Sequence, residues 1–281
     1  MPELPEVETI ARTLTPLITN QVVSGVSLLN ERALEGPLPL DLLTGRRILG
    51  ARRRGKLLLI DLEEQDGAEV RGLAIHLRMT GRLFVFPAGT PPGPHTRAIL
   101  DFMEGGRLFF DDARKFGRLR VFSPESDKSW AFWNALGPEP LLISGKGFAR
   151  LFTGRKAAIK SLLLDQSVIA GVGNIYADES LFRAGIAPFA PADQLSEKRL
   201  LRLHKCLKEV LLASIEACGS SIRDYRTARG DAGAFQNSFQ VYGRGGQPCL
   251  ACGTTLQSCR VAGRTTVWCP RCQGRRQCRS H

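Results

Sequence analysis

The chain has 281 residues, 43% of them hydrophobic and 23% charged, with a net charge of +12. That length allows two domains and a small third one, and the basic surplus favours polyanionic partners such as nucleic acid or an acidic membrane surface. The longest apolar runs, such as residues 57–60, are too short to span a bilayer, and early acids such as Glu3 and Glu6 argue against a secretory signal, so we expect a cytoplasmic protein.

An amphipathic helix over residues 6–18 is the first element that the sequence predicts. Its apolar residues recur at spacings of three, four and three, at Val7, Ile10, Leu14 and Leu17. The opening "MPELPEVET" supplies acids that suit the positive end of a helix dipole, and Pro5 is tolerated near a helix start. This interpretation accounts for the acids but leaves Pro2 unexplained.

Short apolar runs broken by glycine, proline and charge follow from residue 22 to about 122. Runs such as "KLLLIDL", "GRLFVF" and "RAILDF" at close intervals indicate an antiparallel sandwich or barrel. The stretch 89–95, "GTPPGPH", is typical of a loop. An extended linker at 136–141 then leads into helical patterns, the longest of which has Ser196 as its N-cap and stops at Gly219.

Two C-x2-C pairs lie near the end of the chain and are separated by 16 residues, as Cys249, Cys252, Cys269 and Cys272. This spacing predicts a four-cysteine zinc site, and a tetrahedral ion with no open position is structural. Free thiols or disulfides are the disfavoured alternative in a reducing compartment. Residues 243–281 hold seven arginines and no acid, so the tip with Arg260 and Arg264 is suited to phosphate contact.

Four stretches carry a resemblance to a known family. They are "MPELPEVET", "GRLFFDDARKFGRLRVF", "LLLDQSVIAGVGNIYADESLFRAGI" and "VYGRGGQPCLACG…GRTTVWCPRCQ", in this order. The chain resembles bacterial formamidopyrimidine-DNA glycosylase, of the Fpg/Nei family, over nearly its whole length. The resemblance implies an α+β, multidomain fold, with a catalytic β-sandwich domain led by a helix (1–133), a helix-two-turn-helix DNA-binding domain (137–235) and a zinc ribbon (243–281).

The resemblance also implies a covalent mechanism that accounts for the opening residues. Removal of Met1 would leave Pro2 with a secondary amine, which is partly unprotonated at neutral pH and attacks C1′ of a deoxyribose to give an iminium. Glu3 matches the family's general acid. Glu6 either orients the amine or is an ordinary acid of the first helical turn. Lys56 matches a lysine that supports β-elimination, although a solvated basic corner is the alternative, and Arg264 matches the residue for δ-elimination.

Further matches concern DNA contact. The family fills the gap left by an extruded base with a wedge, to which Met79, Arg114 and Phe116 correspond, and core packing is the alternative for the Met and the Phe. Family positions that touch the DNA backbone correspond to His76, His95, Lys156, Lys160 and Asn174, of which His76 could instead be structural. Residues 227–236, "TARGDAGAFQ", are shorter than the family's usual lesion-reading loop, so no base preference is carried over.

We therefore expect a monomeric enzyme of base excision repair, cytoplasmic and associated with the nucleoid, with one structural Zn²⁺. It would remove 8-oxoguanine and formamidopyrimidines from double-stranded DNA and cut the strand at abasic sites by β,δ-elimination. The alternatives are an endonuclease VIII-like glycosylase for oxidised pyrimidines, a non-catalytic damage-binding protein and a zinc-ribbon nucleic-acid adaptor. The set of Met79, Arg114 and Phe116 argues against the first, and Pro2, Glu3 and Lys56 argue against the second.

Overall fold

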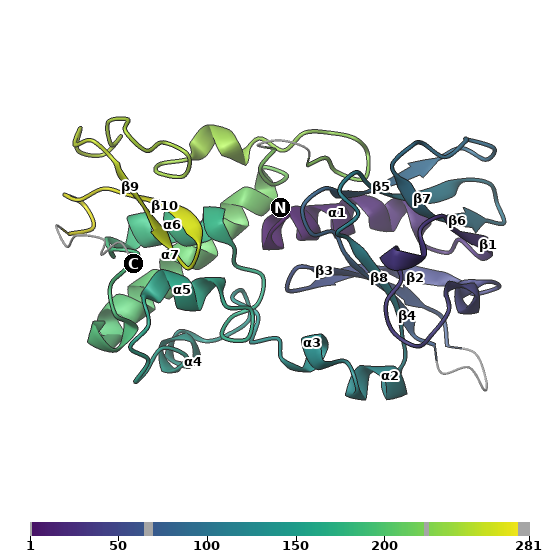
Figure 1. Ribbon diagram of the computed structural model, residues 1–281, viewed down its shortest axis with the longest axis horizontal. Coiled ribbons are helices and arrows are strands. Elements are labelled where there is room, and N and C mark those ends of the chain that lie inside the picture. The colour runs from purple at the N-terminus through teal and green to yellow at the C-terminus, as the bar shows by residue number, and fades with distance from the viewer. Residues whose placement is uncertain (1, 65–69, 222–224, 275–281) are drawn as a thin grey trace. The chain divides into compact units, whose positions relative to one another are not determined.

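The computed structural model describes residues 2–64, 70–221 and 225–274. The chain forms two compact units, shown in Figure 1. We call Met1–Asn134 with Ala217–Ala234 the sandwich unit, and Ala135–Glu216 with Phe235–His281 the ribbon unit. Within the described residues, no helix is both long enough and apolar enough to cross a membrane.

Two four-stranded antiparallel sheets make up most of the sandwich unit. One sheet has the order β1-β6-β7-β5 and the other β2-β3-β4-β8. The strands are β1 Val23–Leu28, β2 Ile48–Arg54, β3 Leu57–Leu62, β4 Gly72–His76, β5 Gly81–Phe86, β6 Thr96–Phe102, β7 Arg107–Asp112 and β8 Arg118–Phe122. Apolar side chains of both sheets share one core with those of α1, which confirms the predicted sandwich with a leading helix.

Helix α1 (Leu4–Ile18) packs against β2, β3 and β5. It begins two residues before the predicted start, because Glu3 is the N-cap of a capping box and Pro5 occupies the first turn. Val7, Ile10 and Leu14 are buried on the face that the periodicity predicts. Four short elements complete the unit: η1 Glu31–Ala33, η2 Leu40–Leu43, α2 Pro124–Lys128 and α3 Ala131–Asn134.

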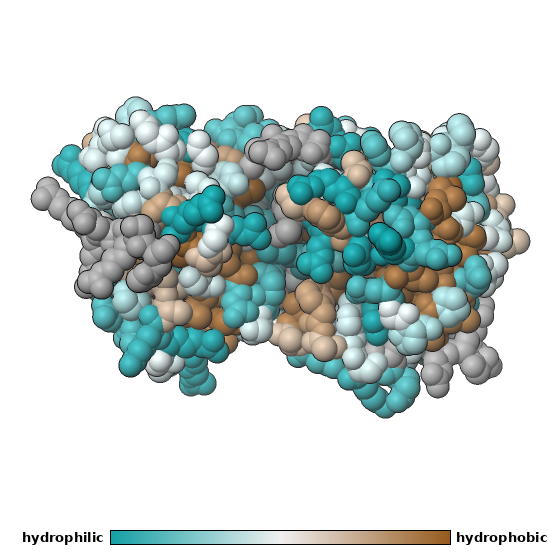
Figure 2. Space-filling model, in the orientation of Figure 1, coloured by the Kyte–Doolittle hydropathy of each residue, from teal (hydrophilic) through white to brown (hydrophobic). Residues whose placement is uncertain are grey.

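The ribbon unit is helical and ends in a two-stranded hairpin. Its elements are α4 Gly145–Arg150, α5 Ile159–Leu164, α6 Asn174–Ala184, η3 Ala192–Gln194, α7 Glu197–Glu216, η4 Phe235–Ser238, β9 Gln257–Val261 and β10 Arg264–Trp268. Helix α7 follows Ser196 as predicted but ends three residues before Gly219, because Cys218 and Gly219 both adopt positive φ. Hydrophilic residues cover much of the molecular surface that Figure 2 shows.

The segment Ala217–Ala234 belongs to the sandwich unit, although the expected helical domain ran to residue 235. Contacts with α1 explain the difference: the backbone N–H of Ala228 donates to Thr13 Oγ1, and the Tyr225 hydroxyl donates to the carbonyl oxygen of Glu6. Hydrophobic periodicity could not show this return of the chain, because the segment has neither a helical nor a strand pattern.

Candidate active site

The start of α1 buries both of its leading acids. Glu3 is 4% exposed and Glu6 is 2% exposed, and Pro2 is buried beside them. The backbone N–H of Glu3 donates to Glu6 Oε2 at 2.9 Å, and the Glu3 carboxylate accepts from the backbone N–H of Glu6. The two acids therefore hold each other and the first turn in place, which is the local reason for the spacing in "PELPE". Met1 lies outside the described residues.

A second partner fixes Glu6 from a distant part of the chain. Its Oε1 atom accepts hydrogen bonds from the backbone N–H and the hydroxyl of Ser220, both at 2.9 Å. A Cβ atom at Gly219, where φ is +78°, would lie 3.2 Å from Glu6 Cγ. Burial, followed by the nearby Glu6 charge, raises the pKa of Tyr225, so this hydroxyl stays protonated. Sequence reasoning missed Ser220 and Tyr225, since no motif links them to α1.

Lys56 lies in the two-residue turn between β2 and β3, directly before the strand that it was expected to open. Gly55 precedes it with a φ of +59°, as tight hairpin turns require. Lys56 is only 7% exposed, so the alternative of a solvated basic corner is not supported.

Arg53 connects that turn with α1. Its Nε lies 3.1 Å from Glu8 Oε2, and its Nη1 donates to the carbonyl oxygen of Gly55 at 3.0 Å. The Arg53 side chain is 7% exposed. Arg52, by contrast, pairs with Asp61 on the surface, with 54% of its side chain exposed. Two neighbouring arginines thus differ in role: one positions the Lys56 turn, and the other is solvated.

His76 ends β4 as a buried, neutral histidine. Burial lowers its pKa to about 3, and the charges of Arg78 and Lys56 contribute. Its Nδ1 accepts the backbone N–H of Arg78 at 3.1 Å, so the proton of the neutral ring resides on Nε2. The ring can therefore donate one hydrogen bond to a phosphate but cannot offer it a positive charge. His95 is exposed in the predicted loop.

The three predicted wedge residues come together at the surface. Met79 is 40% exposed and Phe116 is 46% exposed, so core packing does not account for them. The Arg114 guanidinium lies over the Phe116 ring, 4.8 Å from its centroid, and its Nη1 lies 3.2 Å from Met79 Sδ. Met79 lies in the turn between β4 and β5, and Arg114 and Phe116 lie in the turn between β7 and β8; we call these the wedge turns. Each contains a non-glycine residue at positive φ, Arg78 in the first and Lys115 in the second.

Asp112 anchors both wedge turns, and sequence reasoning missed it. Its Oδ1 accepts hydrogen bonds from the Thr80 hydroxyl and from the backbone N–H of Arg114, while its Oδ2 accepts from the backbone N–H of Gly117 at 2.6 Å. Asp112 is 1% exposed. A buried carboxylate with all these donors fixes one turn relative to the other. The "DDARKFG" stretch was the only available signal, and its first acid, Asp111, could equally have been chosen.

In the ribbon unit, the four predicted cysteine ligands form one cluster. Their sulfur atoms all lie within 4.8 Å of one another, with 3.4 Å between the sulfurs of Cys252 and Cys269 and 4.0 Å between those of Cys249 and Cys272. Ligands about 2.3 Å from a tetrahedral zinc ion would be about 3.8 Å apart. The cluster thus fits one structural zinc ion with four cysteine ligands.

Lys160 is not on the surface. It is 0% exposed, and its Nζ lies 2.6 Å from Asp178 Oδ1 and donates to Thr266 Oγ1 at 2.7 Å. Burial raises the pKa of Asp178 to about 6, against the opposing effect of Lys160. The pair joins α5 and α6 to strand β10, where the backbone N–H of Val267 donates to Asp178. The contact of Lys160 with DNA stays a prediction, which its burial does not favour.

The other predicted contacts in the ribbon unit are more accessible. Lys156 and Arg264 are exposed, and in the described part of the chain neither side chain has a hydrogen-bonding or ionic partner. Arg264 opens β10 directly after the turn residues Ala262 and Gly263, both at positive φ. Asn174 is the first residue of α6, and its Nδ2 donates to the carbonyl oxygen of Thr265 at 3.0 Å, next to Arg264.

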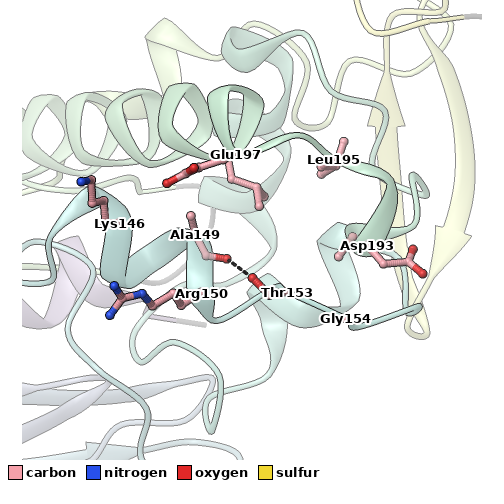
Figure 3. Close-up of a pocket in the computed structure, with 10 residues that line it drawn as sticks. Lys146, Ala149, Arg150, Thr153, Gly154, Asp193, Leu195 and Glu197 are labelled. Atoms are coloured by element: carbon pink, nitrogen blue, oxygen red, sulfur yellow. Dashed lines mark hydrogen bonds between the residues drawn. The ribbon is translucent and has the colours of Figure 1, made fainter.

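Each unit contains a cavity. The ribbon unit's cavity, of about 320 Å³, is lined by none of the residues predicted for the site. Figure 3 shows its mixed charges, with Lys146 and Arg150 as the bases and Asp193 and Glu197 as the acids. The sandwich unit's cavity, of about 270 Å³, includes His76 in its lining.

Three known domain families match the sequence in order. Residues 1–119 match the formamidopyrimidine-DNA glycosylase N-terminal domain, residues 136–226 match the formamidopyrimidine-DNA glycosylase H2TH domain, and residues 246–274 match the zinc finger found in FPG and IleRS. These matches follow the order of the predicted sandwich, helical domain and ribbon.

Whole-chain relatives agree with the domain matches. Formamidopyrimidine-DNA glycosylase of Nitratidesulfovibrio vulgaris is 44% identical, over 97% of this chain and 100% of the relative. The crystal structure of the MutM (Fpg) protein of Thermus thermophilus has a TM-score of 0.86 at 43% identity, covering 97% of this chain and 98% of that one. A mutant of Lactococcus lactis Fpg, in complex with DNA containing Fapy-dG, has a TM-score of 0.87 at 36% identity, covering 97% and 99%. The chain therefore belongs to the formamidopyrimidine-DNA glycosylase family.

Proposed function

We propose that this protein is a DNA glycosylase and AP lyase of base excision repair that removes oxidised purines from duplex DNA. The observation that carries the proposal is the buried start of α1, where Pro2 and Glu3 precede a helix held by reciprocal hydrogen bonds. Family membership and the complex of the Lactococcus lactis relative with Fapy-dG DNA support the substrate class. The same proposal places the protein in the cytoplasm, associated with the nucleoid, as a monomer.

The chemistry would proceed through a covalent intermediate. After removal of Met1, the Pro2 nitrogen attacks C1′ of the damaged nucleoside, the base departs with its bonding electrons, and the amine loses its proton. Glu3 then supplies a proton to O4′ of the sugar, so that the C1′–O4′ bond breaks and an iminium forms between C1′ and the Pro2 nitrogen. Lys56 supports loss of a C2′ proton with departure of the 3′ phosphate, and Arg264 supports the second elimination, which releases the 5′ phosphate.

Extrusion of the base requires a replacement in the stack, which the wedge residues supply. Met79 and Phe116 are exposed and each contacts Arg114, and Asp112 holds the turns that carry them, so little ordering is needed when they enter DNA. His76, His95, Lys156 and Asn174 are proposed to contact the backbone. For Lys160, burial supports a positioning role in place of a direct contact.

Borohydride trapping tests the proposal. The purified protein and a Pro2→Gly variant would be incubated with duplexes that carry either 8-oxoguanine or an oxidised pyrimidine. We expect a covalent adduct on 8-oxoguanine that the variant largely loses. Trapping on the pyrimidine alone would reassign the protein to the endonuclease VIII branch, and tight binding with no adduct would identify a damage-binding protein.

A further inference from the structure

The cavity of the sandwich unit lies where the ends of β4 and β8 meet the segment that follows α2. Its lining is basic and aromatic, and consists mainly of His76, Arg78, Arg118, Arg120, Trp130 and Phe132. At about 270 Å³ it lies near the lower end of the sizes usual for small-molecule sites. Such a volume is of the order of a single nucleotide.

Three guanidinium groups give the cavity a positive wall. Arg118 is held in place, since its Nη1 donates to the carbonyl oxygens of Gly117 at 2.8 Å and Lys115 at 3.2 Å. Arg78 is exposed, and among the described residues its guanidinium has no hydrogen-bonding or ionic partner. Because His76 stays neutral, the arginines supply the cavity's positive charge. Planar guanidinium groups are well suited to phosphate oxygens.

The aromatic wall is rigid. Trp130 is 6% exposed, and it stacks on Trp133 with a centroid distance of 5.8 Å and an interplanar angle of 14°. The Arg120 guanidinium lies 4.8 Å from the Trp130 centroid and also packs close to Gly36. Phe132 is half-buried, with its ring 5.8 Å from that of His76 in an edge-on arrangement. Nucleobases stack on aromatic rings and on guanidinium planes of this kind.

The cavity also offers both a hydrogen-bond donor and an acceptor. The donor is His76 Nε2, because Nδ1 already accepts the Arg78 N–H. The acceptor is the Glu35 carboxylate, which also lines the cavity and has no hydrogen-bonding or ionic partner in the described ranges. A ligand that satisfies the site has a flat ring with donors and acceptors at its edge and carries an anionic group.

We propose that this cavity is a nucleotide subsite, which binds one nucleobase together with its phosphate. The base lies against Phe132 and the guanidinium planes, and the phosphate contacts Arg78 and Arg118. The nucleotide comes either from solution or from an unpaired strand end, and the second source rests on the proposed function. β,δ-Elimination leaves phosphorylated ends on both sides of the gap, so the reaction itself would produce such termini.

Calorimetric titration of the full-length, zinc-loaded protein with dGMP tests the proposal. Deoxyguanosine and inorganic phosphate are the comparison probes, and we expect each to bind at least about tenfold more weakly than dGMP. Arg118→Gln should weaken dGMP binding by about tenfold or more, and Arg118→Lys should recover only part of it, because lysine lacks the planar fork. Phe132→Leu keeps an apolar side chain but removes the ring, and should also weaken binding. Arg12→Gln removes an equal charge from α1 outside the cavity lining and should leave binding unchanged.

The outcomes distinguish the two sources of the nucleotide, and they test the subsite separately from the glycosylase proposal. Stronger competition by a duplex with one unpaired 5′-phosphorylated dG than by its blunt counterpart would identify a strand end as the source. Equal competition by the two duplexes, or none by either, would identify the free nucleotide. Absence of dGMP binding, equal binding of phosphate, or equal loss in Arg12→Gln would overturn the subsite. Borohydride trapping by the wild-type protein is measured separately, so failure of the glycosylase proposal would not be confused with failure of the subsite.

Discussion

Ser220 donates two hydrogen bonds to one carboxylate oxygen of Glu6, from its backbone N–H and from its hydroxyl, both at 2.9 Å. The other carboxylate oxygen accepts the backbone N–H of Glu3. Glu6 therefore links the residue next to the proposed nucleophile with the segment Ala217–Ala234. Of the two roles that the sequence left open for Glu6, orientation of the N-terminus is the one that these contacts favour.

The Glu6→Gln variant tests that link. An amide in place of the carboxylate turns one acceptor into a donor, so it must oppose either the Glu3 N–H or the Ser220 donors. We expect the free energy of unfolding to fall by about 1–3 kcal/mol and trapping on 8-oxoguanine DNA to fall more than tenfold. Urea unfolding and borohydride trapping measure the two effects. Glu31→Gln, at an exposed position, is the control; an equal effect there would refute the link.

Neighbouring arginines of β2 offer a matched comparison. Arg53→Gln removes the connection from Glu8 to the Gly55 carbonyl, so we expect lower stability, by about 1–3 kcal/mol, and slower strand cleavage because Lys56 loses its support. Arg52→Gln breaks only a surface pair with Asp61, which is worth about 1 kcal/mol or less. Cleavage of an abasic-site duplex and urea unfolding are the measurements. Equal behaviour of the two variants would contradict the positioning role.

The pH dependence of stability follows from His76. Its folded-state pKa of about 3 is below the ordinary 6.5, so the unfolded chain binds a proton that the folded chain does not. The contribution of the neutral His76 to the free energy of unfolding is therefore fully present above pH 6.5 and decreases as the pH falls, by about 2 kcal/mol at pH 5. His76→Gln should remove that part of the loss between pH 7 and pH 5, as measured by urea unfolding. His95→Gln, at the exposed loop, should keep the wild-type slope.

Loss of zinc should act on the ribbon unit alone. Cys249→Ala removes a buried ligand, and a hairpin of this size has little core without its metal. We expect duplex binding to be abolished while the far-ultraviolet signal of the sandwich unit persists, and a chelator should do the same to the wild-type protein. Cys218→Ala removes an exposed thiol outside the cluster and should bind duplex normally. Normal duplex binding by the Cys249 variant would refute a structural role for the metal.

Local patterns predicted much of this protein. The face of α1, the strands and the two cysteine pairs depend on spacing within short segments, whereas the wedge residues were identified from the family resemblance. Contacts between distant segments could not be predicted, and for this reason Ser220, Asp112 and the role of Arg53 were missed. The burial of Lys160 was not predicted either, because a lysine is almost never fully buried unless it is paired, and its partner Asp178 lies 18 residues further along the chain.

Variants of two lysines in the ribbon unit should distinguish direct contact with DNA from a positioning role. Lys156 is exposed, so Lys156→Gln should weaken duplex binding and reduce the slope of log K against log salt by about 0.9, the amount expected for one lost phosphate contact. Lys160→Met leaves Asp178 buried without its partner, so it should cost about 3–5 kcal/mol of stability.

The double variant Lys160→Met/Asp178→Leu completes the comparison. It removes both charges, so it should recover much of the stability lost in Lys160→Met and keep the wild-type salt slope. Salt titrations of duplex binding and urea unfolding measure these effects on the same samples. A salt slope reduced in the double variant as much as in Lys156→Gln would show that Lys160 reaches a phosphate after all. An unchanged slope with altered strand cleavage would instead place its effect on β10, the strand that Arg264 opens.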